Sequence, residues 1–151
     1  MPSLRRSTRS SRLRKLIRYN KAMDKKYTIM LVDDDKFLLD MYCKKFERDG
    51  AEVSVAVGPE DALSKLRGGL KPEILVLDII MPGMDGIELL EAIRKEKLAP
   101  DATVVMLTNE SNRERIEKAQ TLGIKGYIVK ATTIPTEVVA KIKEIANLKT
   151  K

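Results

Sequence analysis

Residues 33–35 of this 151-residue chain are three consecutive Asp, and they follow directly after a short apolar run. Three later apolar runs lead into Asp78, Thr108 and Lys130. Short runs rich in Ile, Leu, Val and Met are typical of buried parallel strands. Because the carboxyl ends of parallel strands lie along one edge of a sheet, these polar residues are predicted to meet in one crevice. Carboxylates, a hydroxyl and an ammonium together suit a magnesium ion and a phosphoryl group.

Strand-like and helix-like segments alternate from Tyr27 onward, which indicates a parallel α/β sheet. Right-handed crossovers favour a doubly wound, five-stranded, flavodoxin-like sheet with the strand order 2-1-3-4-5. The switch point of that order lies between Asp33/Asp34 and Asp78. We expect strands at residues 28–32, 52–57, 73–78, 103–107 and 126–129, and helices at residues 36–49, from Pro59 to Gly68-Gly69, at 87–97, at 112–122 and after Pro135.

The first helix is predicted to bury one apolar face, with Asp35 capping its amino end and Gly50 just past its carboxyl end. The residues that we assign to this face are Phe37, Leu38, Met41, Tyr42 and Phe46.

The composition excludes several kinds of chemistry. Histidine is absent, which removes Ser/His and Cys/His nucleophiles and His metal ligands. The single cysteine, Cys43, excludes an internal disulfide and a thiolate cluster, and it suits a reducing cytosol. No stretch reaches the roughly 18 apolar residues of a membrane span. We therefore expect a soluble, cytoplasmic protein without a membrane span.

The net charge of +7 is unevenly distributed. Residues 1–26 hold ten Lys and Arg and one Asp, whereas the rest of the chain holds 19 basic and 21 acidic residues. The predicted domain at residues 27–149 is thus mildly acidic, and the basic charge belongs to an N-terminal extension at residues 1–26. The whole-chain charge is no evidence that the domain binds nucleic acid.

For this extension we expect disorder, because its Arg- and Ser-rich composition cannot bury much apolar surface. Leu13, Leu16 and Ile17 share one helical face, so a short basic amphipathic helix on a membrane or nucleic acid is an alternative. A transit peptide and a true start at Met23 are further alternatives.

The four strand ends together resemble the receiver domain of two-component response regulators, of the stand-alone chemotaxis type, over about residues 27–149. The segments that carry the resemblance are the Asp triplet at 33–35, Leu77-Asp78-Ile79-Ile80-Met81-Pro82, Leu107-Thr108-Asn109 and Tyr127-Ile128-Val129-Lys130. The resemblance implies that Asp34 and Asp78 bind Mg²⁺ directly, that the Ile80 carbonyl adds a third oxygen, and that Asp33 acts largely through water. A dication would also keep neighbouring carboxylates ionised together.

Asp78 is, by the same resemblance, the phosphoacceptor. The phosphoryl group would come from a phosphohistidine on a sensor histidine kinase or a histidine phosphotransfer protein, since this chain has no His. Lys130 would offset the charge of the group, and Thr108 would bind one of its oxygens. Movement of Thr108 would let Tyr127 turn and switch the surface formed by the fourth helix, fifth strand and fifth helix. The chain would thus be a signalling domain with self-catalysed phosphorylation and dephosphorylation rather than a metabolic enzyme.

Two positions depart from the pattern of that family, and Ile80 flanks the path of a hydrolytic water. Ala131 follows Lys130 where proline with a cis bond is usual, so the loop should be either trans and differently shaped or cis and strained. Asn109 is bulkier than the expected small residue and would narrow access for the kinase imidazole. Ile80 cannot hydrogen-bond a hydrolytic water, so we expect a long-lived phosphoryl group.

Other functions are weaker matches. A haloacid-dehalogenase-like phosphatase needs a second Asp two residues after the nucleophile, where Ile80 stands. A flavodoxin-like carrier would need a loop without the acids at 33–35, which would repel FMN phosphate. A receiver used only for docking is disfavoured because all five site residues are present. No DNA-binding domain follows in this chain, so we expect either a stand-alone regulator or a piece cut before an effector.

Overall fold

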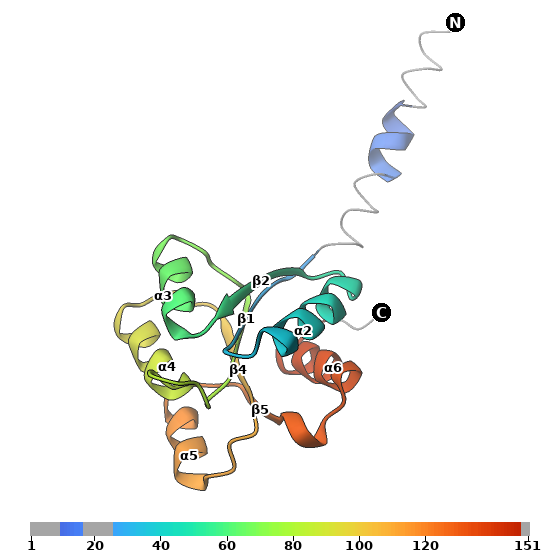
Figure 1. Cartoon of the computed structure of the whole chain (residues 1–151). Coiled ribbons are helices and arrows are strands. Elements are labelled where there is room, and N and C mark those ends of the chain that lie inside the picture. Colours follow the sequence, from blue (N-terminus) through green and yellow to red (C-terminus); the bar gives the residue numbers. More distant parts are fainter. Residues whose placement is uncertain (1–9, 17–25, 149–151) are drawn as a thin grey trace, which may run out of the picture.

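The computed structural model describes residues 10–16 and 26–148 (Figure 1). Five parallel strands form one sheet in the order β2-β1-β3-β4-β5, which confirms the predicted flavodoxin-like order. The strands are β1 (Thr28–Asp33), β2 (Glu52–Val57), β3 (Ile74–Leu77), β4 (Thr103–Thr108) and β5 (Gly126–Val129). The helices that follow them are α2 (Lys36–Arg48), α3 (Pro59–Arg67), α4 (Gly86–Lys95), α5 (Arg113–Thr121) and α6 (Pro135–Ile145), and the 3-10 turn η1 (Lys130–Thr132) follows β5.

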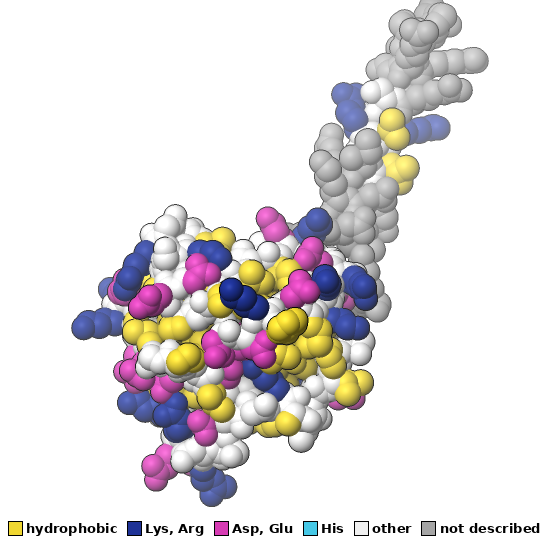
Figure 2. All heavy atoms as spheres, viewed as in Figure 1, with side chains coloured by type: hydrophobic (Ala, Val, Ile, Leu, Met, Phe, Trp, Pro, Cys, Tyr) yellow, Lys and Arg dark blue, Asp and Glu magenta, His cyan; other side chains and the backbone are white. Residues whose placement is uncertain are grey.

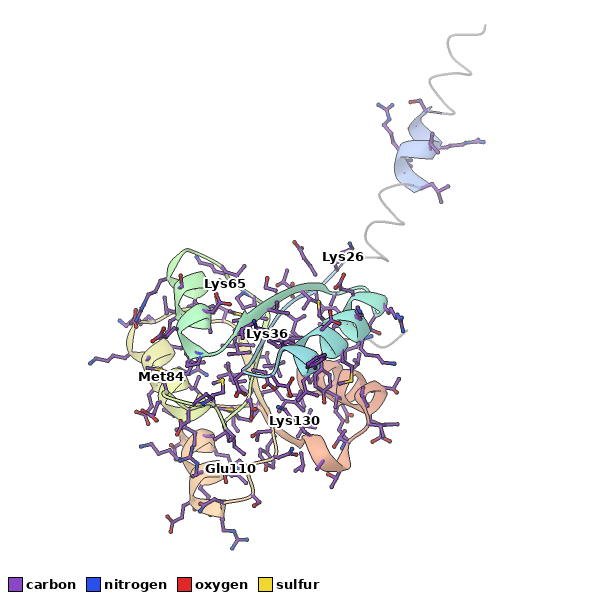
Figure 3. The ribbon with its side chains drawn as sticks, in the orientation of Figure 1. Lys26, Lys36, Lys65, Met84, Glu110 and Lys130 are labelled. Carbon is purple, nitrogen blue, oxygen red and sulfur yellow. The ribbon has the colours of Figure 1, made fainter. Side chains whose placement is uncertain are left out.

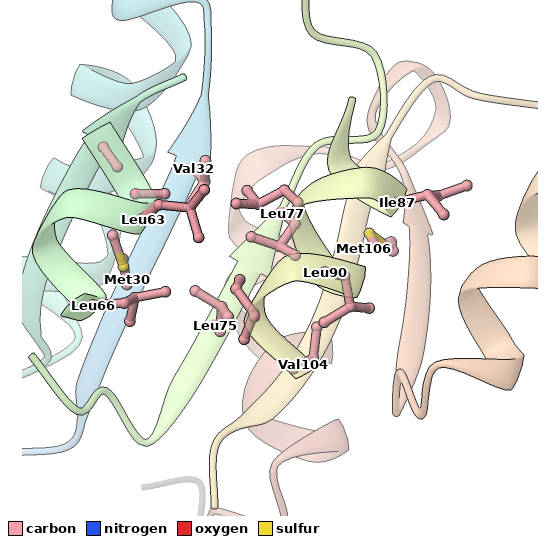
Figure 4. Close-up of a cluster of buried hydrophobic side chains, with 14 of the residues drawn as sticks. Met30, Val32, Leu63, Leu66, Leu75, Leu77, Ile87, Leu90, Val104 and Met106 are labelled. Carbon is pink, nitrogen blue, oxygen red and sulfur yellow. The ribbon is translucent and has the colours of Figure 1, made fainter. Parts of the chain in front are cut away.

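The helices cover both faces of the sheet, with α2 and α6 together on one side and α3, α4 and α5 on the other (Figure 1). Successive residues of each central strand point to opposite faces. Leu31 and Val76 therefore pack under α2 and α6, whereas their neighbours Val32 and Leu77 pack under α3 and α4, in the cluster that Figure 4 shows. Both faces are apolar, which explains why β3 reads as a continuous hydrophobic run.

The signals for helix ends act as predicted. Asp35 caps α2, because its side chain accepts hydrogen bonds from the N–H groups of Phe37 and Leu38. Pro59 and Pro135 stand in the first turns of α3 and α6. Gly50 follows the end of α2 with a φ of 96°, a conformation that favours glycine.

The predicted apolar face of α2 was wrong at one position. Phe37 is 90% exposed, whereas the buried residues of α2 are Leu39, Tyr42 and Phe46. At 100° per residue, Phe37 lies about 160° around the helix from Leu39. Phe37 therefore points away from the sheet.

Residues 10–16 of the N-terminal extension are helical, and Leu13 and Leu16 are exposed. Ile17, Met23 and residue 149, the predicted end of the domain, lie outside the described residues. Among the described residues, no helix is long and apolar enough to span a membrane.

Candidate functional site

Three carboxylates meet at the carboxyl edge of the sheet. Asp33 ends β1, Asp34 follows it, and Asp78 directly follows β3, the neighbouring strand. One carboxylate oxygen from each of the three lies within 4.8 Å of the others. Asp33 and Asp78 are 6% and 5% exposed, whereas Asp34 faces solvent. Figure 2 shows acidic side chains gathered at the centre of this face, with hydrophobic side chains beside them.

Local hydrogen bonds fix the two buried carboxylates. Oδ1 of Asp33 accepts the N–H of Asp35 at 3.0 Å, and Oδ1 of Asp78 accepts the N–H of Ile80 at 3.1 Å. In both cases the bond reaches two residues onward, as in an Asx turn. The turn directs the second carboxylate oxygen into the crevice, where it is available to another group.

Gly86 allows α4 to begin against this site. Its N–H donates to the carbonyl of Ile79 at 2.9 Å, and a Cβ at position 86 would lie 2.0 Å from the carbonyl oxygen of Asp78. Only glycine permits such a close backbone approach. Position 86 thus helps to place Asp78, although glycine has no side chain that could take part in the chemistry.

Lys130, which Figure 3 labels, directly follows the end of β5. Its ammonium donates to Oδ2 of Asp33 and lies 2.9 Å from Oδ2 of Asp78. Burial disfavours the charged ammonium, but the two carboxylates outweigh burial and raise the pKa of Lys130. The cation is therefore held between the two buried acids.

The loop after Lys130 has the trans form, one of the two that the sequence left open. The Lys130–Ala131 peptide bond is trans and leads into η1. The N–H of Ala131, which proline would lack, donates to Oδ1 of Asn109 at 2.7 Å. The two departures from the family pattern thus contact one another, and Asn109 links the loop after β4 to the loop after β5.

Thr108 is fully buried at the end of β4 and pairs in register with Val129, the residue before Lys130. Its Oγ1 accepts the N–H of Glu110 at 3.2 Å, and the Tyr127 hydroxyl donates to the Glu110 carbonyl. Burial, followed by the nearby Glu110 charge, raises the pKa of Tyr127. Thr108 and Tyr127 are therefore linked through the backbone of Glu110.

Sequence reasoning missed an ion-pair network beside this loop. Nη2 of Arg115 lies 2.6 Å from Oδ2 of Asp85, and Nε of Arg115 lies 3.0 Å from Oε2 of Glu110. Asp85 also caps α4 in a capping box with Glu88, a spacing that the sequence does contain. Burial opposes ionisation of Asp85, but the Glu88 N–H and Arg115 prevail and lower its pKa.

The donor set fits a hard dication. Oxygen ligands at a solvent-accessible site suit Mg²⁺, which retains waters and prefers carboxylates. The three acids provide such oxygens, and Lys130 leaves them with a net negative charge. The structure brings together Asp33, Asp34, Asp78 and Lys130, and it places Thr108 and Tyr127 on the adjoining strands; the ligand role of the Ile80 carbonyl stays a prediction.

Comparison with known proteins identifies the class. The family model of the response regulator receiver domain matches residues 29–143, so the chain belongs to this family. It is therefore a receiver domain of two-component signalling, which is consistent with phosphoacceptor signalling.

Curated relatives are longer than this chain. The alkaline phosphatase synthesis transcriptional regulatory protein PhoP of Bacillus subtilis (strain 168) is 34% identical over 123 residues, which cover 82% of this chain and 49% of that protein. The phosphate regulon transcriptional regulatory protein PhoB of Escherichia coli (strain K12) is 30% identical over 117 residues, which cover 78% and 50%. The chain thus spans about half the length of these relatives.

Solved receiver structures match most of the fold. A CheY-like response regulator receiver domain protein from Methanospirillum hungatei JF-1 has a TM-score of 0.73 and 30% identity, over 82% of this chain and 95% of that chain. The BeF3-activated receiver domain of DrrB has a TM-score of 0.68 and 26% identity, over 81% of this chain and 98% of that chain.

Proposed function

We propose that this receiver accepts a phosphoryl group on Asp78 and signals by a change of its surface. The observation that carries the proposal is the contact of Asp78 with the Lys130 ammonium, at a place where carboxylate oxygens of Asp33 and Asp34 lie within 4.8 Å. The Ile80 N–H fixes one oxygen of the Asp78 carboxylate, so the other oxygen is directed into the crevice. The partner would be a sensor histidine kinase or a histidine phosphotransfer protein, in the cytoplasm.

In the proposed step, a carboxylate oxygen of Asp78 attacks the phosphorus of a phosphohistidine on the partner. The new P–O bond forms as the P–N bond breaks, and the departing imidazole keeps the electron pair and takes up a proton from water. Lys130 lies beside the receiving oxygen and would stabilise the charge on the transferring group. The product is an aspartyl phosphate whose hydrolysis resets the domain.

Asp33, Asp34, Asp78 and the Ile80 carbonyl would hold Mg²⁺. When bound, the ion would supply positive charge that offsets repulsion between the carboxylates and the phosphoryl oxygens. The carboxylates would hold the ion beside the receiving oxygen of Asp78, and Lys130 would have to share its two acids with the ion.

Thr108 and Tyr127 would carry the signal outward. The Thr108 hydroxyl keeps its own proton to donate, because its oxygen accepts the Glu110 N–H. A bond from Thr108 to a phosphoryl oxygen would shift the Glu110 backbone, to which Tyr127 is also bound. The surface of α5, β5 and α6 would then switch between two arrangements.

Phosphoramidate tests the proposal, because its P–N bond imitates that of phosphohistidine. With Mg²⁺, we expect the protein to gain one hydroxylamine-labile phosphoryl group, whereas Asp78→Asn with Mg²⁺ and the wild type with a chelator should gain none. The same protein should not turn over p-nitrophenyl phosphate, which a phosphatase would hydrolyse. Failure of the folded wild type to be labelled would indicate a docking-only receiver.

A further inference from the structure

Helix α5 is held to the domain mainly by polar contacts. Its only buried residue is Ala119. Its attachments to α4 include the ion pair of Arg115 with Asp85 and that of Lys118 with Glu91, whose Nζ and Oε1 lie 3.1 Å apart. Because few residues of α5 are buried, these ion pairs contribute to where the helix and the loop before it lie.

Arg115 connects two loops that border the acidic crevice. Asp85 belongs to the loop after Asp78, and Glu110 belongs to the loop after Thr108. The acids are each less than one-fifth exposed, and Arg115 approaches both through different nitrogens of one guanidinium. A planar guanidinium can hold two such partners in a fixed geometry, which a lysine ammonium cannot do.

Glu110 is the residue through which Arg115 reaches the site. Its N–H donates to Thr108 Oγ1, and its carbonyl accepts the Tyr127 hydroxyl. The carboxylate of the same residue lies 3.0 Å from Nε of Arg115. A movement of the Glu110 backbone would therefore disturb both the hydroxyl that would bind a phosphoryl oxygen and the tyrosine that would report it.

We infer that Arg115 is a positioning residue, which fixes Glu110 between the two loops so that the Thr108 hydroxyl is oriented before a phosphoryl group arrives. The inference rests on the proposed function, since it assigns a role in the recognition of that group. Arg115 does not touch the reacting atoms and acts on the Thr108 hydroxyl through Glu110. Loss of Arg115 should weaken recognition of a phosphoryl group and leave the binding of Mg²⁺ unchanged, because Asp33 and Asp78 are held by contacts that do not involve Arg115.

Beryllofluoride, a mimic of the phosphoryl group, tests the inference by titration in saturating Mg²⁺. We expect Arg115→Ala to weaken beryllofluoride binding about two- to fivefold, the range for a partly exposed ion pair. Its affinity for Mg²⁺ alone should equal that of the wild type. Arg115→Lys should recover only part of the loss, because one ammonium cannot serve both acids.

Arg67→Ala is the matched control, because Arg67 makes a similar two-nitrogen contact with Glu96, at 2.8 and 2.7 Å. This pair lies at the carboxyl ends of α3 and α4, whereas the acids lie at the carboxyl ends of the strands. This variant should bind beryllofluoride as the wild type does. Glu110→Gln provides a second test, and its effect should not add to that of Arg115→Ala in the double variant.

Unchanged or tighter beryllofluoride binding by Arg115→Ala would overturn the inference while the proposed function stands. An equal loss in Arg67→Ala would overturn it too, by showing a general effect of lost surface charge. If the folded wild type binds Mg²⁺ but not beryllofluoride, the proposed function itself fails, and the inference fails with it.

Discussion

The ammonium of Lys130 lies 2.9 Å from Oδ2 of Asp78 and also donates to Asp33, so one cation joins the end of β5 to the ends of β1 and β3. Both acids are almost completely buried. Buried charges have lost their hydration and are stabilised by one another. Removal of one partner therefore leaves the others uncompensated.

Lys130→Met is therefore expected to lower the free energy of unfolding by about 3 kcal/mol in the absence of divalent ions. Mg²⁺ should restore much of this stability, because a dication can replace the lost positive charge, and it should bind more tightly than to the wild type. Urea unfolding with and without Mg²⁺ measures both effects. Lys141→Met, at an exposed position of α6, serves as the control. Equal destabilisation with and without Mg²⁺ would contradict this account of the acids.

The free energy of unfolding is expected to fall at alkaline pH because of Tyr27. Burial, followed by the 2.7 Å hydrogen bond to Asp49, raises the pKa of the Tyr27 hydroxyl. A group whose pKa is raised on folding stabilises the fold fully below its unfolded pKa, about 10 for tyrosine, and loses this effect as the pH rises through the folded pKa. Tyr27→Phe should thus be less stable than the wild type at neutral pH, with the difference shrinking above about pH 10. Urea midpoints across this range measure it, and a constant difference would refute the assignment.

Gly86→Ala should be unusually damaging. The new Cβ would lie 2.0 Å from the Asp78 carbonyl oxygen, which is backbone and cannot turn aside. We expect a loss of about 2–3 kcal/mol in unfolding free energy, as for an overpacked core, and a lower affinity for Mg²⁺. At Gly68, the helix cap of α3, a Cβ would meet its nearest atom at 3.3 Å, so Gly68→Ala provides the control. Similar effects at the two positions would argue against the close approach.

Ile80→Asn should quicken loss of the phosphoryl group severalfold. The Ile80 side chain is 53% exposed beside Asp78 and offers no hydrogen bond to an attacking water, whereas an amide does. The decay of the labelled protein, followed by mass spectrometry, measures the rate. Ile134→Asn changes an equally exposed isoleucine, at 59%, in the cap of α6 and should leave the decay unchanged. Unchanged or slower decay in Ile80→Asn would count against this role.

The strand ends explain why so much of the site could be predicted from the sequence. Apolar runs place Asp33, Asp78 and Thr108 at the carboxyl ends of β1, β3 and β4, and parallel topology then brings these ends to one edge. Residue order and topology suffice for that inference. The role of Asp35 as the cap of α2 could also be predicted, because Asp35 directly precedes that helix.

Arg115 and Gly86 show what the sequence could not provide. The partners of Arg115 depend on how α5 lies against α4, and no local spacing encodes this docking. The demand for glycine at position 86 arises from the approach of two backbone segments. Phe37 was misassigned because apolar residues occur on several sides of α2, and only contact with the sheet selects the buried side.

Intact mass after incubation with acetyl phosphate and Mg²⁺ tests whether Asp78 is the phosphoacceptor. The wild-type chain should gain the mass of one phosphoryl group, and Asp78→Ala, verified as folded, should gain none. Absence of the added mass in the folded wild type, or its persistence in Asp78→Ala, would contradict the assignment of Asp78 as the phosphoacceptor.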